Sequence, residues 1–329
     1  MSKKFWSSLS IVLNVFFDEN EHYHSMFTNA CKNKNIELVN ILLALDTTVD
    51  IINAIRQASQ KGHIAVVERL LQDRRIDPSD NNNNAIRWAS FRGHIAVVER
   101  LLQDSRVDPS ANNNEAIRIA SQNGHIAVVE RLLQEPKNRV DPSANINNAI
   151  RWASIRSHIA VVERLLQDSR VDPSANNNEA ICCASQNGHI TVVDRLLQDG
   201  RVDPSANNNS AIRWASHNGH IAVVDRLLQE GRVDPSANNN EAICYASENG
   251  HIAVVDRLLQ DSRADPSAYN NNAIRWASIR GHIAVVERLL QEGRVDPSAN
   301  NNEAMVLCKD FYKRTGHVLK NLTHKHNQQ

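Results

Sequence analysis

The stretch "NNNEAIRIASQNGHIAVVERLLQ", residues 112–134, decides the fold. Ile117, Ala120, Ser121 and Gly124 follow the i, i+3, i+4, i+7 spacing of one helix face. The first half of the stretch therefore predicts a short helix with a small-residue face, which a neighbouring helix can approach closely. The apolar residues of "HIAVVERLLQ" recur at the same spacing and predict a second amphipathic helix. Gly124 lies between the two and suits the positive φ of a tight helix end.

The segment before this stretch, "RVDPSANNN" (residues 106–114), interrupts the helices. The Asp-Pro step disfavours helix, and Asn tolerates turns. We expect these asparagines to cap the helix that follows.

The whole pattern recurs along the chain. Taking the histidine as the reference, we name each repeat by it: His63, His94, His125, His158, His189, His220, His251 and His282. The steps are 31 residues except before His158, where "QEPKNRVDPS" makes the loop two residues longer. A fixed period in this range is typical of a solenoid, in which a unit buries its apolar faces only against its neighbours.

This unit resembles the ankyrin repeat over about residues 23–325. "EAIRIAS" takes the place of the family's T-P-L-H-x-A-A, "NGHIAVVERLL" that of G-H-x-x-V-V-x-L-L, and "RVDPSA" that of A-D-V-N-A. The T-P helix start is missing and the period is two residues short of the usual 33, so we expect reduced β-hairpins between repeats. Such repeats resemble the divergent DPS-NNN type abundant in large DNA viruses and some protists. The resemblance implies an all-α helix-turn-helix solenoid that is not an enzyme, binds proteins and has its first helices along a concave groove.

Both ends of the chain depart from the pattern. Residues 1–22 include an apolar run that predicts a capping helix, with Phe5, Leu9, Val12 and Phe16 on one face; a targeting segment is the alternative. Met26–Leu45 and Glu303–Leu322 are similar to weakened end repeats, and we expect residues 326–329 to form a disordered tail.

Composition favours an intracellular chain. Lys plus Arg and Asp plus Glu each number 37, so there is no global attraction to nucleic acid or to an anionic membrane. The five cysteines are irregularly spaced, which argues against a disulfide framework. No apolar run is long enough for a membrane span. We expect a cytoplasmic monomer, with the nucleus as an alternative compartment.

The sequence offers no catalytic, metal or cofactor motif, so we predict neither an enzyme nor a cofactor. The histidines recur one helix-packing distance apart, about 8–10 Å. Such a distance is too long for neighbours to share a zinc ion bound at about 2.0 Å. We expect each histidine to make a structural hydrogen bond between repeats.

Differences between the repeats indicate where a partner binds. The second helix barely changes, whereas the first helix varies at positions −7, −6, −3 and −2 counted back from the histidine. These positions form one stripe at i, i+4 spacing, which we call the first-helix stripe. Our candidate binding residues on it are Trp88, Trp152, Trp214, Trp276, Tyr245, Arg87, Arg92, Arg151, Arg156, Arg213, Arg275, Arg280, Phe91, His217 and Glu248.

The tryptophans occur in every second repeat, and the repeats between them carry Glu115, Glu179 and Glu241 just before the helix. Exposed tryptophan and arginine are typical of protein interfaces. Alternatively, each tryptophan packs across the neighbouring helix. We expect a protein or peptide partner, and an acidic one would suit the arginines. Single-stranded nucleic acid is the alternative, although acidic residues in every repeat oppose it. A ubiquitin-ligase adaptor role rests on family analogy alone.

Overall fold

The computed structural model of the chain describes residues 19–44, 51–136, 139–298 and 306. The helix predicted around residues 5–16, the weakened repeat at 303–322 apart from Val306, Cys308 and the tail lie outside these residues. The chain divides into two units, Met1–Asp172 and Pro173–Gln329, which we describe separately.

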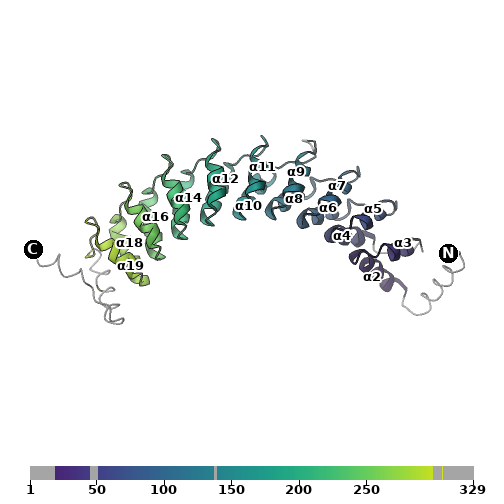
Figure 1. Cartoon of the computed structure of the whole chain (residues 1–329), viewed down its shortest axis with the longest axis horizontal. Coiled ribbons are helices and arrows are strands. Elements are labelled where there is room, and N and C mark those ends of the chain that lie inside the picture. Colours follow the sequence, from purple (N-terminus) through teal and green to yellow (C-terminus); the bar gives the residue numbers. More distant parts are fainter. Residues whose placement is uncertain (1–18, 45–50, 137–138, 299–305, 307–329) are drawn as a thin grey trace, which may run out of the picture. The chain divides into compact units, whose positions relative to one another are not determined.

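In the first unit, each repeat contributes two helices that follow one another along the unit (Figure 1). Its first helices are α2 (Glu19–Lys32), α4 (Ile51–Lys61), α6 (Asp80–Arg92), α8 (Ala111–Gln122) and α10 (Ala144–Ile155). Its second helices are α3 (Ile36–Ala44), α5 (Ile64–Leu71), α7 (Ile95–Leu102), α9 (Ile126–Leu133) and α11 (Ile159–Leu166). The pair α2–α3 confirms a first repeat around Met26–Leu45.

The second unit repeats this arrangement. Its first helices are α12 (Ala175–Gln186), α14 (Ala206–His217), α16 (Ala237–Glu248) and α18 (Ala268–Arg280). Its second helices are α13 (Ile190–Leu197), α15 (Ile221–Leu228), α17 (Ile252–Leu259) and α19 (Ile283–Leu290). The fold is therefore the predicted all-α solenoid of helix-turn-helix repeats, and the described residues contain no β-strand where hairpins were expected to be reduced.

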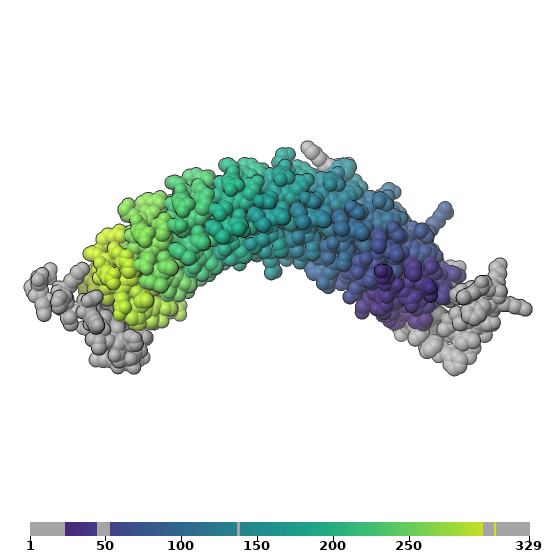
Figure 2. All heavy atoms as spheres, in the orientation of Figure 1, coloured from purple at the N-terminus to yellow at the C-terminus, as the bar shows by residue number. Residues whose placement is uncertain are grey.

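The core of each repeat consists of the residues that the helical spacing predicts. Ile117 and Ala120 of α8 are fully buried, as are Val129 and Leu132 of α9. Within each unit successive first helices pack side by side, because alanine and serine on their contact faces allow close approach. In the space-filling view the repeats of a unit follow one another as adjacent bands of colour (Figure 2).

The asparagine run has a conformation that differs from the expected helix cap. In the seven first helices from α6 to α18, three consecutive residues have φ between 53° and 60°. The third asparagine does not cap the following helix as predicted, because the Oδ1 of Asn114 accepts a hydrogen bond from the backbone nitrogen of Asp141 in the next repeat. The run instead forms one turn of left-handed helix, closed by the bond from Asn114 N to Ser110 O at 2.7 Å. Asparagine suits it because a left-handed conformation costs most other residues about 1–2 kcal/mol each.

The third residue of each left-handed turn connects one repeat to the next. Asn83 is buried, and its Oδ1 accepts a hydrogen bond from the backbone nitrogen of Asp108 at 2.7 Å. The same bond recurs in both units at Asn114, Asn147, Asn178, Asn209, Asn240 and Asn271. The aspartate that donates it belongs to "DPS"; in Asp108 its Oδ1 accepts bonds from the nitrogen and hydroxyl of Ser110. The constant "DPS" and "NNN" motifs are therefore two halves of one connection between repeats.

An arginine in each loop makes a second connection. Arg106 donates from Nη1 to the carbonyl of Ile76 in the preceding repeat, 2.8 Å away, and forms an ion pair with Asp104. Hydrogen bonds from Arg106 lower the pKa of Asp104, although burial opposes the shift. Within the described residues, no helix combines the length and apolarity that a membrane span requires.

Candidate functional site

The first-helix stripe lies on the right-handed part of each first helix, away from the buried small residues. In α8, Ile117, Ala120 and Ser121 are buried, whereas Arg118 and Ile119 at positions −7 and −6 are half-buried. Most side chains at position −2 are exposed, including Arg92, Arg156 and Arg280. The stripe therefore has a half-buried part at positions −7 and −6 and an exposed part at position −2.

In the first unit the half-buried part of the stripe includes an aromatic pair. The rings of Trp88 and Phe91 meet edge to face, with centroids 5.4 Å apart. The guanidinium of Arg92 lies 5.0 Å from the centroid of the Phe91 ring. A pocket of about 280 Å³ opens beside Trp88 and reaches Glu115 and Ile119 of the next repeat. The rings are thus held by packing and still border open space.

In the second unit the aromatic contacts cross between repeats. Trp214 stacks on Tyr245 of the next repeat, with centroids 6.2 Å apart and planes at 27°. His217 meets both rings edge to face, at 5.4 Å from Trp214 and 5.2 Å from Tyr245. Trp214 is half-buried, so its ring packs between repeats and also presents surface on the stripe, where binding of a partner stays a prediction.

Several arginines of the stripe already have carboxylate partners. Arg87 Nη2 lies 2.6 Å from Glu115 Oε2 in the next repeat, and Arg213 pairs in the same way with Glu241. Burial raises the pKa of Glu241, but bonds from Asn238 and Tyr245 and the charge of Arg213 outweigh it, so the pKa is lowered overall. The alternation of glutamate with the tryptophan repeats follows from this pairing. The sequence shows the alternation of glutamate and tryptophan, whereas the pairing with position −7 depends on how the repeats stack.

The same arginines brace the left-handed turns. Arg213 Nη1 donates to the carbonyls of Asn207 and Asn208, both at 3.3 Å, and Arg87 does the same at Asn81 and Asn82. Position −7 therefore has a structural role as well as a place on the stripe.

The other candidate residues also lie on the stripe. Trp152, Arg151, Arg275 and Glu248 are half-buried, and Trp276 is the most exposed of the four stripe tryptophans at 36%. Arg280 Nη2 pairs with Glu248 of the preceding repeat at 2.9 Å. No carboxylate pairs with Arg92 or Arg156 among the described residues.

Six of the eight repeat histidines make the predicted connection between repeats: His63, His94, His125, His158, His220 and His251. His125 donates from Nε2 to the carbonyl of Phe91 at 2.9 Å, and His251 to the carbonyl of His217 at 2.9 Å. A side chain at Gly124 would collide with the ring of His158, because an added Cβ would lie 2.5 Å from Nδ1. Gly124 also has a φ of +75°, as its place between the helices predicts.

The described cysteines form no disulfide, and Cys31, Cys182 and Cys244 are poorly reactive. Burial raises the pKa of Cys31 and of Cys244 to about 12, and that of Cys182 to about 11. A thiol with so high a pKa holds very little thiolate at neutral pH, and the thiolate is the nucleophile.

The repeat geometry and the connections between repeats agree with a comparison to known families. A family model described as Ankyrin repeats (3 copies) matches residues 27–113, 86–177, 117–209, 150–239 and 212–301. The chain belongs to the ankyrin-repeat family. Ankyrin repeats are generally protein-interaction modules and typically non-enzymatic scaffolds. No curated protein matches this ankyrin-repeat chain.

Proposed function

We propose that this protein is a scaffold that binds a protein partner across the first-helix stripe. The observation that carries the proposal is the aromatic cluster of Trp214, His217 and Tyr245, whose rings fix one another while remaining only partly buried. Aromatic side chains that are ordered before binding lose little entropy when a partner covers them. Tryptophan, tyrosine and arginine are also the residues on which interface energy concentrates.

The exposed arginines of the stripe indicate the chemistry of the partner. In the first unit, Arg92 and Arg156 are exposed and have no carboxylate partner, so a partner carboxylate would meet an available guanidinium there. We therefore propose that an acidic segment of the partner lies over the stripe of the first unit.

A nucleic-acid ligand is less well supported than the count of arginines suggests. Arg87 and Arg280 are ion-paired with glutamates of neighbouring repeats. Binding to single-stranded nucleic acid depends on a positively charged groove that follows the backbone. Neutralised guanidinium groups provide less of that charge.

The proposal is tested by affinity capture from the native cell with the full chain as bait. A variant with both Trp88→Ala and Trp214→Ala should no longer capture the protein that the unaltered chain captures, because both changes delete surface of the stripe. Glu99→Lys is the matched control, since Glu99 is exposed on the second helix α7. Loss of capture with Glu99→Lys but not with the tryptophan variant would contradict the proposal, as would competition for the captured partner by single-stranded RNA.

A further inference from the structure

Position −7 of the first helix is a place for a guanidinium group. Six of the eight repeats carry arginine there, and Cys182 and Cys244 occupy the other two. Arg87 and Arg213 show what the group does, since each donates to two carbonyls of the left-handed turn in its own repeat. Those carbonyls therefore form an acceptor site that the chain normally fills itself.

Cys244 leaves this site open. The cysteine is 6% exposed and too short to reach over the turn of its own repeat. A pocket of about 350 Å³ lies there instead, and its lining includes Asn238, Asn239, Tyr245, Glu248, Tyr269 and Trp276. Asn238 and Asn239 are the counterparts of the asparagines whose carbonyls accept from Arg213 one repeat earlier.

The lining of this pocket matches the chemistry of a cation. It includes two carboxylates, Glu241 and Glu248, and no lysine or arginine. Glu241 is occupied by Arg213 and the Tyr245 hydroxyl. Glu248 accepts from Arg280 through Oε1, whereas its Oε2 has no hydrogen-bond partner among the described residues.

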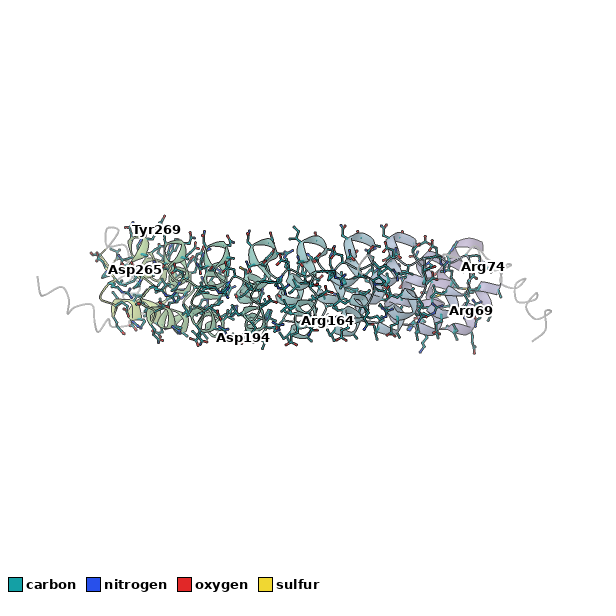
Figure 3. The ribbon with its side chains drawn as sticks, turned by 90° about the horizontal axis from the view of Figure 1, so that it is seen from above. Arg69, Arg74, Arg164, Asp194, Asp265 and Tyr269 are labelled. Atoms are coloured by element: carbon teal, nitrogen blue, oxygen red, sulfur yellow. The ribbon has the colours of Figure 1, made fainter. Side chains whose placement is uncertain are left out.

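Aromatic surface completes the pocket. Tyr269 is 68% exposed and Trp276 is 36% exposed, and both border it together with Tyr245. Tyr269 stands where the other six described left-handed turns have their first asparagine, and its φ is 55°. In Figure 3, Tyr269 and Asp194 of α13 lie at opposite edges of the second unit. The pocket is thus built on the turns and the first helices rather than on the second helices.

We propose that this pocket binds an arginine side chain of the protein partner, which takes the place of the arginine that Cys244 replaces. The inference rests on the proposed function and assigns one contact within it. A guanidinium fits better than an ammonium because it is planar, stacks on aromatic rings and donates several hydrogen bonds in a fixed fork. An anionic group does not fit, because Glu241 and Glu248 line the site.

The test uses the full chain and short capped peptides of glycine around one central residue, followed through tryptophan fluorescence or NMR shifts. The arginine peptide should bind about tenfold or more tightly than the uncharged citrulline peptide, as expected for a charged hydrogen bond. The lysine peptide should be intermediate. Free arginine should bind more weakly than the capped peptide, because its own carboxylate meets the glutamates. Equal binding of the citrulline peptide, or tighter binding of free arginine, would overturn the proposal.

Substitutions then locate the site. Cys244→Arg restores the residue of the other repeats, should fold and should abolish binding of the arginine peptide by filling the pocket. Cys182→Arg makes the same change in another repeat and should leave binding unchanged. If circular dichroism shows that Cys244→Arg is unfolded, Tyr269→Asn replaces it; this change restores the common asparagine and should weaken binding several-fold.

Unchanged binding in a folded Cys244→Arg variant, or in Tyr269→Asn, would contradict the assignment. The peptide measurements require no partner. Their failure would remove this pocket alone, and the capture experiment with Trp88 and Trp214 would still test the proposed function separately.

Discussion

The side-chain oxygen of Asn209 accepts a hydrogen bond from the backbone nitrogen of Asp234, 2.7 Å away in the next repeat. Asn209 is only 8% exposed and also closes a left-handed turn, with a φ of 57°. One residue therefore both shapes its own loop and holds the following one.

Asn209→Ala should lower the free energy of unfolding by about 2 kcal/mol, from a lost hydrogen bond and from the cost of alanine in the left-handed region. Chemical denaturation measures the change. Asn208→Ala is the matched control, because Asn208 has the same backbone conformation but an exposed side chain. Equal losses in the two variants would show that the bond to Asp234 contributes nothing.

Ile146 should be a source of strain. It occupies the middle of a left-handed turn at a φ of 58° and is 62% exposed, whereas the equivalent residue in the other described turns is asparagine. A β-branched residue is a rare outlier in this region. Ile146→Asn should therefore stabilise the fold by about 1 kcal/mol and raise Tm by a few degrees. A lower Tm would contradict this explanation of the asparagine run.

Ser157 provides a second test of backbone strain. It has a φ of 62° at the turn where the other regular repeats have glycine. Ser157→Gly should raise the free energy of unfolding by about 0.5–1 kcal/mol. Relief of the backbone strain stabilises the fold, and the greater freedom of glycine in the unfolded chain offsets part of this gain. Gly124→Ala is the opposite change and should destabilise the fold, because its Cβ would also meet the ring of His158. An unchanged or lower Tm for Ser157→Gly would mean that the turn is not strained.

Much of the fold followed from the spacing of apolar and small residues. Ile117, Ala120 and Val129 are buried where helical periodicity places them, because burial of one face is the main requirement of a stacked helix. The left-handed turn could not be predicted in the same way. A tendency to form turns does not specify three successive left-handed residues. The hydrogen bond that Asn83 accepts comes from the backbone nitrogen of Asp108 in the next repeat, which the local sequence does not show.

For the candidate site, the sequence identified the stripe but not the state of its charges. Arg87 and Arg213 looked like ligands for a partner, whereas both are paired with glutamates about 28 residues further along. Side-chain partners at such separations depend on how the repeats are stacked, which composition and local spacing do not encode.

Acid should weaken the ion pair between Arg75 and Asp73, which is the counterpart of the pair between Arg106 and Asp104. The hydrogen bond from Arg75 lowers the pKa of Asp73 from 3.8 to about 2. Because this pKa is lower in the folded than in the unfolded chain, the carboxylate stabilises the fold above pH 3.8, and the contribution is lost as pH falls through about 2.

Asp73→Asn should therefore reduce stability at pH 7 by less than about 1 kcal/mol, since solvent screens the pair, and should flatten the loss between pH 4 and 2. Denaturation midpoints across this range measure both effects. Asp80→Asn is the control: burial and then the charge of Asp77 raise the pKa of Asp80, so its removal should not reduce stability at pH 7. An unchanged acid profile in Asp73→Asn would contradict the assignment.

The central claim, that a partner binds the first-helix stripe, is tested most directly by titrating the captured partner with the Trp214→Ala variant while its Tm is recorded. Trp214 is half-buried against Tyr245, so its loss should lower Tm only modestly. The free energy of unfolding should fall by less than the loss of about 3–5 kcal/mol that removal of a core aromatic typically costs. Affinity should fall at least about tenfold, as for a hot-spot residue. Unchanged affinity, with Glu99→Lys on α7 abolishing binding instead, would contradict the account and place the interface on the second helices.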